Sequence, residues 1–105
     1  MDQMELHRHL ISVLDEQTRK LEQKIAQMGG ASKVSDDIRF KLAIVRDSLR
    51  RVHAVQEQLE DGLTRDLAGI LAYEVKAMSQ RCDELKSSIQ EQMPAVAAAP
   101  AAILN

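Results

Sequence analysis

The sequence predicts an all-α fold, an up-down-up bundle of three long amphipathic helices. Large apolar residues recur with alternating spacings of three and four, which places them on one stripe of a helix because a turn takes about 3.6 residues. Glycines and a proline divide the chain into three segments of similar length. The 105 residues include one Phe, one Tyr and no Trp, a composition that suits aliphatic helix packing better than a β-sandwich.

The first predicted helix covers residues 2–28. Acidic residues in its first turn and lysines towards its end suit the helix dipole. Gly29-Gly30 is expected to end it, because glycine readily adopts the left-handed conformation that closes helices. Its stripe contains six large apolar residues and two polar ones: Met4, His7, Ile11, Leu14, Thr18, Leu21, Ile25 and Met28.

The second predicted helix covers residues 36–60. Ser35 is a good N-cap, and two aspartates follow it in the first turn. Phe40 and Ile44 form a second apolar strip on another side of the helix. The main stripe, interrupted by the polar Gln56, consists of Ile38, Leu42, Val45, Leu49, Val52 and Leu59.

The third predicted helix covers residues 64–93, with Thr64 as its N-cap. Pro94 is expected to end it, because proline lacks the backbone N–H and its ring clashes with the preceding turn. Residues 94–105 are then a flexible Ala/Pro-rich tail outside a single domain of residues 1–93. The stripe consists of Ala68, Leu71, Val75, Met78, Cys82, Leu85 and Ile89, and is widened by Leu67 and Ile70.

Gly62 decides between two architectures. If the chain turns there, three helices of matched length form the bundle. If Gly62 is tolerated inside a helix, at a cost of about 1 kcal/mol, the second and third helices fuse into one very long helix. The alternative fold is therefore a helical hairpin whose overhanging helix is covered by dimerisation. The matched lengths favour three helices.

The composition excludes several classes of protein. The net charge of −2 gives no long-range attraction for a polyanion or an anionic membrane. Cys82 is alone, so no intramolecular disulfide forms and a reducing compartment is expected. No basic segment followed by an apolar run begins the chain, and no stretch reaches the ~20 apolar residues that span a bilayer. We expect a cytoplasmic location and no membrane partner.

No residue set supports catalysis. His7 and His9 are two residues apart and point about 200° apart on a helix, so they cannot share a metal ion. Cys82 lies on the apolar stripe, where a buried cysteine behaves as a small hydrophobe. The two glycines at 29–30 lack the lysine and hydroxyl of a phosphate loop. We therefore expect a protein that is not an enzyme and has neither a metal nor another cofactor.

Association through helices is the remaining function. We expect a protein–protein interaction module, which acts as a subunit, an adaptor or scaffold, or a chaperone-like binder of another helical protein, either as a homo-oligomer or in a hetero-complex. The apolar faces are wider than a single packing seam, which favours this interpretation. The expected contact residues are Leu6, Leu10, Val13, Phe40 and Ile44, with Arg46 and Arg50 at the rim.

In the alternative function, the chain is a nucleic-acid-binding or regulatory protein that acts through the basic face of the second helix. Between residues 38 and 53 that helix carries five Lys or Arg residues, with Asp47 as its only acidic one. Nucleic-acid binders usually add an overall basic charge, and single-strand binders add stacking aromatics. The chain has neither, which argues against this alternative.

Overall fold

The computed structural model is an all-α up-down-up bundle, as predicted. It describes the backbone of residues 3–60 and 65–104 and the side chains of residues 4–60 and 66–92. The helices are α1 (Gln3–Gln27), α2 (Asp36–Glu60) and α3 (Arg65–Leu104), and a short 3₁₀ turn η1 (Ala31–Lys33) lies between α1 and α2. The described ranges contain no strand.

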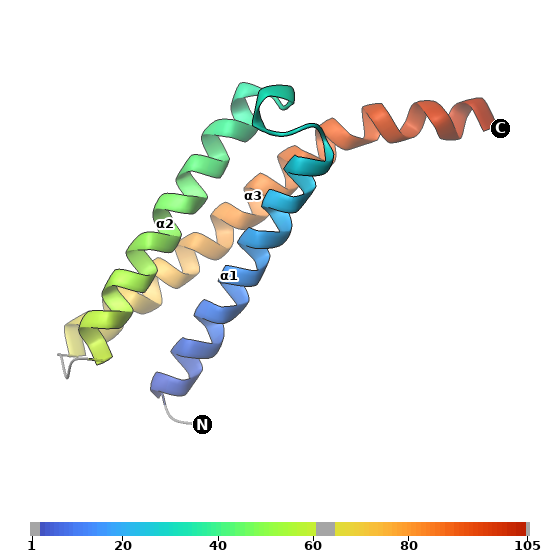
Figure 1. Cartoon of the computed structure of the whole chain (residues 1–105). Coiled ribbons are helices and arrows are strands. Elements are labelled where there is room, and N and C mark those ends of the chain that lie inside the picture. Colours follow the sequence, from blue (N-terminus) through green and yellow to red (C-terminus); the bar gives the residue numbers. More distant parts are fainter. Residues whose placement is uncertain (1–2, 61–64, 105) are drawn as a thin grey trace.

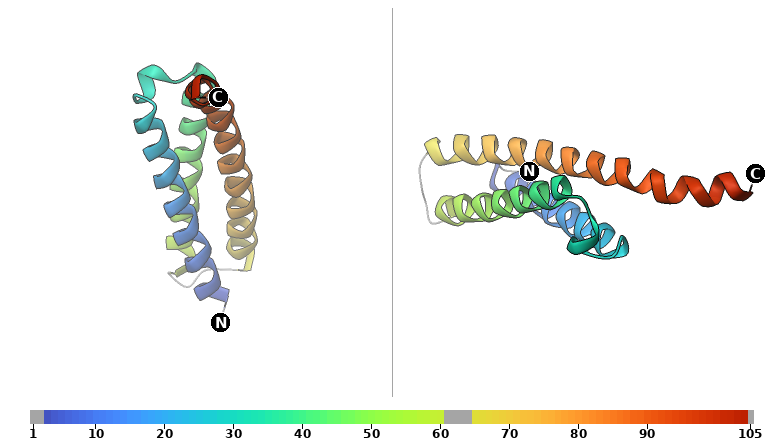
Figure 2. Two further views of the ribbon diagram at one scale, coloured as in Figure 1. Left: turned by 90° about the vertical axis from the view of Figure 1, so that its right-hand side faces the viewer. Right: turned by 90° about the horizontal axis from the view of Figure 1, so that it is seen from above.

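The three helices lie side by side, with α1 and α3 running in the same direction and α2 in the opposite one (Figures 1 and 2). Because α2 ends at Glu60 and α3 returns alongside it, the alternative of one fused helix is wrong. The predicted turn at Gly62 and the predicted N-cap Thr64 lie outside the described residues.

The connection between α1 and α2 contains the predicted glycine end of α1 and the predicted serine N-cap of α2. The amides of Gly29 and Gly30 donate to the carbonyls of Ala26 and Ile25, at 3.1 and 3.0 Å. These two bonds form a Schellman motif, which requires a positive φ, and Gly29 has φ +105°. The Ser35 hydroxyl accepts a bond from the backbone N–H of Ile38 at 3.3 Å, so Ser35 is the N-cap of α2.

The buried core follows the predicted stripes of all three helices. Most residues of the predicted stripes are buried, and the others are partly buried, namely Met4, Met28, Leu49, Leu59, Ala68 and Val75. The spacing did not predict two serines, Ser48 and Ser88, which are buried where α2 meets α3. Ile70, expected to widen the stripe of α3, is instead 47% exposed. The buried apolar residues are Ile11, Leu14, Leu21, Ile25, Val34, Ile38, Leu42, Val45, Val52, Leu71, Met78, Cys82, Leu85 and Ile89.

Two ion pairs and one histidine–carboxylate contact form a regular ladder between the described residues of α1 and α2. On α1 the partners are seven residues apart along the chain, and on α2 they step back by seven, as two antiparallel helices in a fixed register require. Arg8 is basic whereas Asp15 and Glu22 are acidic, so a shift by one rung would place Arg8 against His53 in one direction or Asp15 against Glu60 in the other. The rungs are Arg8 with Glu60 at 2.6 Å, Asp15 with His53 at 2.9 Å, and Glu22 with Arg46 at 2.8 Å.

Polar contacts also join α2 to α3. The Lys41 ammonium donates to the Ser88 hydroxyl at 2.6 Å, and that hydroxyl donates to the Asp37 carboxylate at 3.0 Å. These bonds from Lys41 and Ser88 lower the pKa of Asp37. At the upper end of the bundle the Gln92 carboxamide accepts from the Ser35 backbone N–H at 3.1 Å. The helix α2 is therefore fixed to both of its neighbours.

The prediction that Pro94 ends the third helix is wrong, because the backbone of α3 remains helical to Leu104. Proline removes one hydrogen bond and clashes with the turn before it, which can kink a helix without ending it. The alanines that follow Pro94 have the highest helix propensity and favour continuation. Figure 1 shows the change of direction where the ribbon turns from orange to red, and the red segment runs beyond the other helices. The flexibility expected of residues 94–105 stays a prediction.

His7 is the one buried side chain of the described part whose polar atom lacks a partner. It is 5% exposed, and its Nδ1 has no hydrogen-bond partner there. Because an unpaired buried polar group costs about 1–3 kcal/mol, replacing His7 by Leu is expected to raise the free energy of unfolding by a comparable amount. Chemical denaturation measures this change. His9→Leu, at an exposed position of the same helix, is the control and should change little. A loss of stability in His7→Leu would contradict the prediction.

Candidate interaction surface

The apolar contact residues predicted on α1 lie in one strip beside the core. Leu6 is 44% exposed, Val13 is 39% exposed, and Leu10 between them is partly buried. Continuing their spacing of four and three along the helix leads to Gln17, and then to Lys20 and Lys24. One face of α1 therefore carries an apolar half near its start and a basic half near its end.

The basic half of this strip lines a pocket between α1 and α3. The pocket has a volume of about 160 Å³. The basic half of the strip borders α3 at this pocket, and the residues of the strip share one side of α1, so the whole strip lies along the α1–α3 edge of the bundle. This edge faces the viewer in the left view of Figure 2. The lining residues are Gln17, Lys20, Leu21 and Lys24 of α1 with Cys82, Asp83 and Lys86 of α3.

The facing strip of α3 consists mostly of small residues along its first half. Counting back from Asp83 with spacings of four and three gives Ser79, Lys76, Ala72 and Gly69, all exposed. Gly69, Ala72 and Ser79 are too small to cover Leu6 and Val13 from across the seam, and the one long side chain of this strip, Lys76, is itself exposed. We name the region between the two strips the α1–α3 groove.

The α1–α3 groove differs electrostatically from the two other seams. Between residues 9–27 of α1 and residues 66–92 of α3 there is no ion pair. Among the described residues, α1 and α2 are joined by the pairs Arg8–Glu60 and Glu22–Arg46 and by the Asp15–His53 contact, and α2 and α3 by the pair Arg51–Glu74. Lys20, Lys24 and Lys86 have no contact-distance ion pair or hydrogen bond among the described residues, although the pKa of the Glu16 carboxyl is lowered mainly by Arg19 and to a smaller extent by the nearby Lys20. Three ammonium groups thus meet one carboxylate, that of Asp83, around the pocket.

The thiol of Cys82, which lines the buried side of the pocket, is unreactive. Cys82 is buried, and burial raises the pKa of its thiol, an effect that a hydrogen bond with Thr18 partly offsets. A raised pKa keeps the thiol protonated at neutral pH, where the thiolate is the reactive form. Cys82 therefore acts as a small apolar residue on this side of the pocket, as its position on the stripe predicted.

The predicted contact residues of α2 lie elsewhere. Phe40 is 67% exposed and Ile44 is partly buried, both near the start of α2. Leu6 lies near the start of α1, where Arg8 reaches Glu60 at the opposite end of α2. The two predicted patches are therefore at opposite ends of the bundle and do not form one surface.

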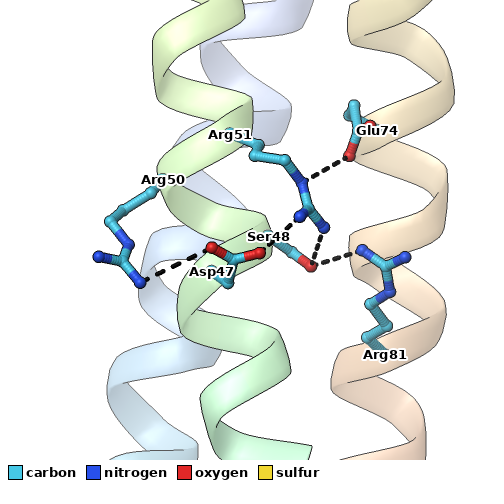
Figure 3. Close-up of polar contacts among 6 residues, drawn as sticks. All are labelled: Asp47, Ser48, Arg50, Arg51, Glu74 and Arg81. Carbon is cyan, nitrogen blue, oxygen red and sulfur yellow. Dashed lines mark hydrogen bonds and ion pairs between the residues drawn. The ribbon is translucent and has the colours of Figure 1, made fainter.

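The basic face of α2 is neutralised within the chain. Figure 3 shows Arg50 and Arg51 on either side of Asp47, with contacts of 3.7 and 2.5 Å. Arg51 also reaches Glu74 of α3 at 3.6 Å. The remaining basic residues of this face are paired as well, namely Arg39 with Asp36, Lys41 with Asp37, and Arg46 with Glu22.

A buried hydroxyl is at the centre of this network. Ser48 is fully buried and accepts hydrogen bonds from Arg81 at 2.5 Å and from Arg51 at 3.4 Å (Figure 3). Arg81 comes from α3 and the other two residues from α2, so the network fixes these helices in register. The guanidinium groups are held by protein partners, which argues against their use as a phosphate-binding face.

Sequence reasoning missed two features of the surface. The lysine cluster combines Lys20 and Lys24 with Lys86, which is far away in the sequence, and only the parallel pairing of α1 with α3 brings them together. Tyr73 is 71% exposed on α3, and its position three residues after Ile70, off the main apolar stripe, was the available signal. Rim residues predicted to contact a partner, Arg46 and Arg50, are engaged in the ion pairs described above.

Within the described residues no group of three or more His, Cys, Asp or Glu side chains is placed to hold a metal ion. In the same part of the chain, none of the helices combines the length and the apolar character that crossing a membrane requires. No protein-family model matches the chain, and no curated protein or solved structure is significantly similar to it.

Proposed function

We propose that this protein is a non-enzymatic interaction module that binds another helical protein through the α1–α3 groove. The observation that carries the proposal is the exposed apolar strip of Leu6 and Val13, which continues into a stretch of the α1–α3 seam, between residues 9–27 and 66–92, that has no ion pair. Contiguous apolar patches, unlike single exposed apolar side chains, mark interaction sites, and Leu6, Leu10 and Val13 follow one another along a single strip of α1. A subunit, adaptor or chaperone-like binder would use such a groove to take up a further helix.

The proposal is tested by making the apolar half of the groove polar. Leu6→Ser with Val13→Ser is expected to reduce the amount of a specifically captured partner at least tenfold, since central apolar contacts dominate most interfaces. Quantitative affinity capture from the source cells measures this, and circular dichroism checks that the helix content is unchanged. Loss of helix content would mean that both side chains belong to the core.

A matched control removes comparable apolar surface from another face. Ile70→Ser with Tyr73→Ser replaces two side chains that are 47% and 71% exposed on α3. This variant should retain the partner. If it loses the partner while Leu6→Ser with Val13→Ser retains it, the interface lies on the outer face of α3 and the proposal is wrong.

A further inference from the structure

We propose that the partner element in the α1–α3 groove is a single amphipathic helix, apolar over the Leu6–Val13 half and acidic over the half lined by Lys20, Lys24 and Lys86. This inference rests on the proposed function and adds the chemistry of the partner. The groove supplies two kinds of surface in a fixed order along one axis. A helix that matches both halves makes a four-helix arrangement with this bundle.

The length of the groove fits one helix. From Leu6 to Lys24 the strip covers 18 residue steps of α1, which at 1.5 Å per residue is about 27 Å. A partner helix of about 18–20 residues spans this distance. Its apolar side chains would lie over the exposed Leu6 and Val13, where the small residues Gly69 and Ala72 of α3 allow close approach.

Charge complementarity defines the other end of the partner helix. Among the residues that the structure describes, the three lysines around the pocket have no ion-pair partner, whereas each arginine of α2 is paired with a carboxylate. Carboxylates from a partner would supply the missing counter-charges. Complementary charges across an interface select the matching partner and fix its orientation more than they increase the affinity.

A second copy of this chain fits the groove less well. Two copies of the α1 strip in parallel would place lysines against lysines, and in antiparallel orientation they would place lysines over Leu6 and Val13. The C-terminal residues 92–104 have no acidic side chain with which to meet the lysines. A nucleic acid would use the lysines but would leave the apolar half uncovered. The two halves together therefore favour an acidic amphipathic helix.

A displayed library of 18-residue helical peptides tests the inference. The peptides have leucine fixed on one stripe and Glu, Lys or Ser randomised at the other positions, and they are selected on the full-length protein. Selection on the wild type is expected to enrich Glu towards one end of the peptide. Selection on the triple variant Lys20→Glu, Lys24→Glu and Lys86→Glu should enrich Lys at the same positions.

Fluorescence anisotropy then measures the affinity of the best peptide from the wild-type selection. The triple variant is expected to weaken binding at least tenfold, with a smaller loss at high salt. The control variant Arg19→Glu, Arg39→Glu and Arg50→Glu makes the same change in net charge away from the groove and should bind within about threefold of the wild type. Steering by net charge alone would weaken both variants equally and would overturn the inference.

The remaining outcomes separate this inference from the proposed function. Peptides that need Leu6 and Val13 but show no charge preference overturn the acidic partner and leave the interaction module intact. No enrichment at all overturns both. A dimer in sedimentation equilibrium that Leu6→Ser with Val13→Ser dissociates means that a second copy fills the groove. A labelled 20-nucleotide DNA strand that binds the wild type, and loses affinity only in the lysine variant, means a phosphate site.

Discussion

Replacing Leu85 by Ala is expected to lower the free energy of unfolding by about 2–5 kcal/mol. Leu85 is fully buried on α3, so its truncation removes apolar contacts and leaves a cavity inside the bundle. A domain of this size is stable by only about 5–15 kcal/mol, and the loss would be a large part of that. Urea denaturation followed by circular dichroism measures the change.

Leu6→Ala is the matched control for this substitution. It removes the same atoms from a side chain that is 44% exposed, so its cost should be below about 1 kcal/mol. Equal costs at the two positions would contradict the assigned core. A small change in the free energy of unfolding for Leu6→Ala would also show that Leu6 is not needed by the core and is therefore available to a partner.

Replacing Gly29 by Ala is expected to lower the free energy of unfolding by about 1–3 kcal/mol. At φ +105° a side chain is strained, and a Cβ added there would lie 2.7 Å from the Lys33 Cγ. The Schellman bonds that close α1 depend on this backbone conformation. Thermal unfolding monitored by circular dichroism should show the loss as a lower Tm.

Gly69→Ala is the control with the opposite sign. Gly69 lies inside α3, and a Cβ added there meets no atom within 4 Å. Because alanine restricts the unfolded chain and glycine does not, this substitution should stabilise the helix by about 0.5–1 kcal/mol. If Gly29→Ala proved neutral, α1 would end without the left-handed turn.

The state of its arginines separates the two functions considered for this chain. A phosphate-binding face needs cations that are free to meet phosphates, since their contacts supply most non-specific affinity. The arginines of α2 instead join it to its neighbours through Glu22 of α1 and Glu74 of α3, or pair with Asp47 within α2. The cations without partners lie beside an apolar strip, and this combination suits a helix of a partner protein.

The helices and their buried faces followed from the sequence. Spacings of three and four identify the core because a stripe of large apolar residues has no other low-energy place than the interior. Gly29 and Ser35 marked the ends of helices, because each has a specific backbone or hydrogen-bonding role there. The prediction from Pro94 was wrong, because a helix can accommodate a proline by kinking and does not have to end there.

The candidate site depended on which helix lies next to which. Leu6 and Val13 were identifiable as an apolar strip on α1, but whether α3 covers that strip depends on the size of the side chains opposite it. Lys86 is more than sixty residues from Lys20, and only the parallel arrangement of α1 and α3 places both around one pocket. The sequence determined the stripe within each helix by local periodicity. The tertiary structure decided which stripes stay open, because charge pairing and groove shape arise between helices.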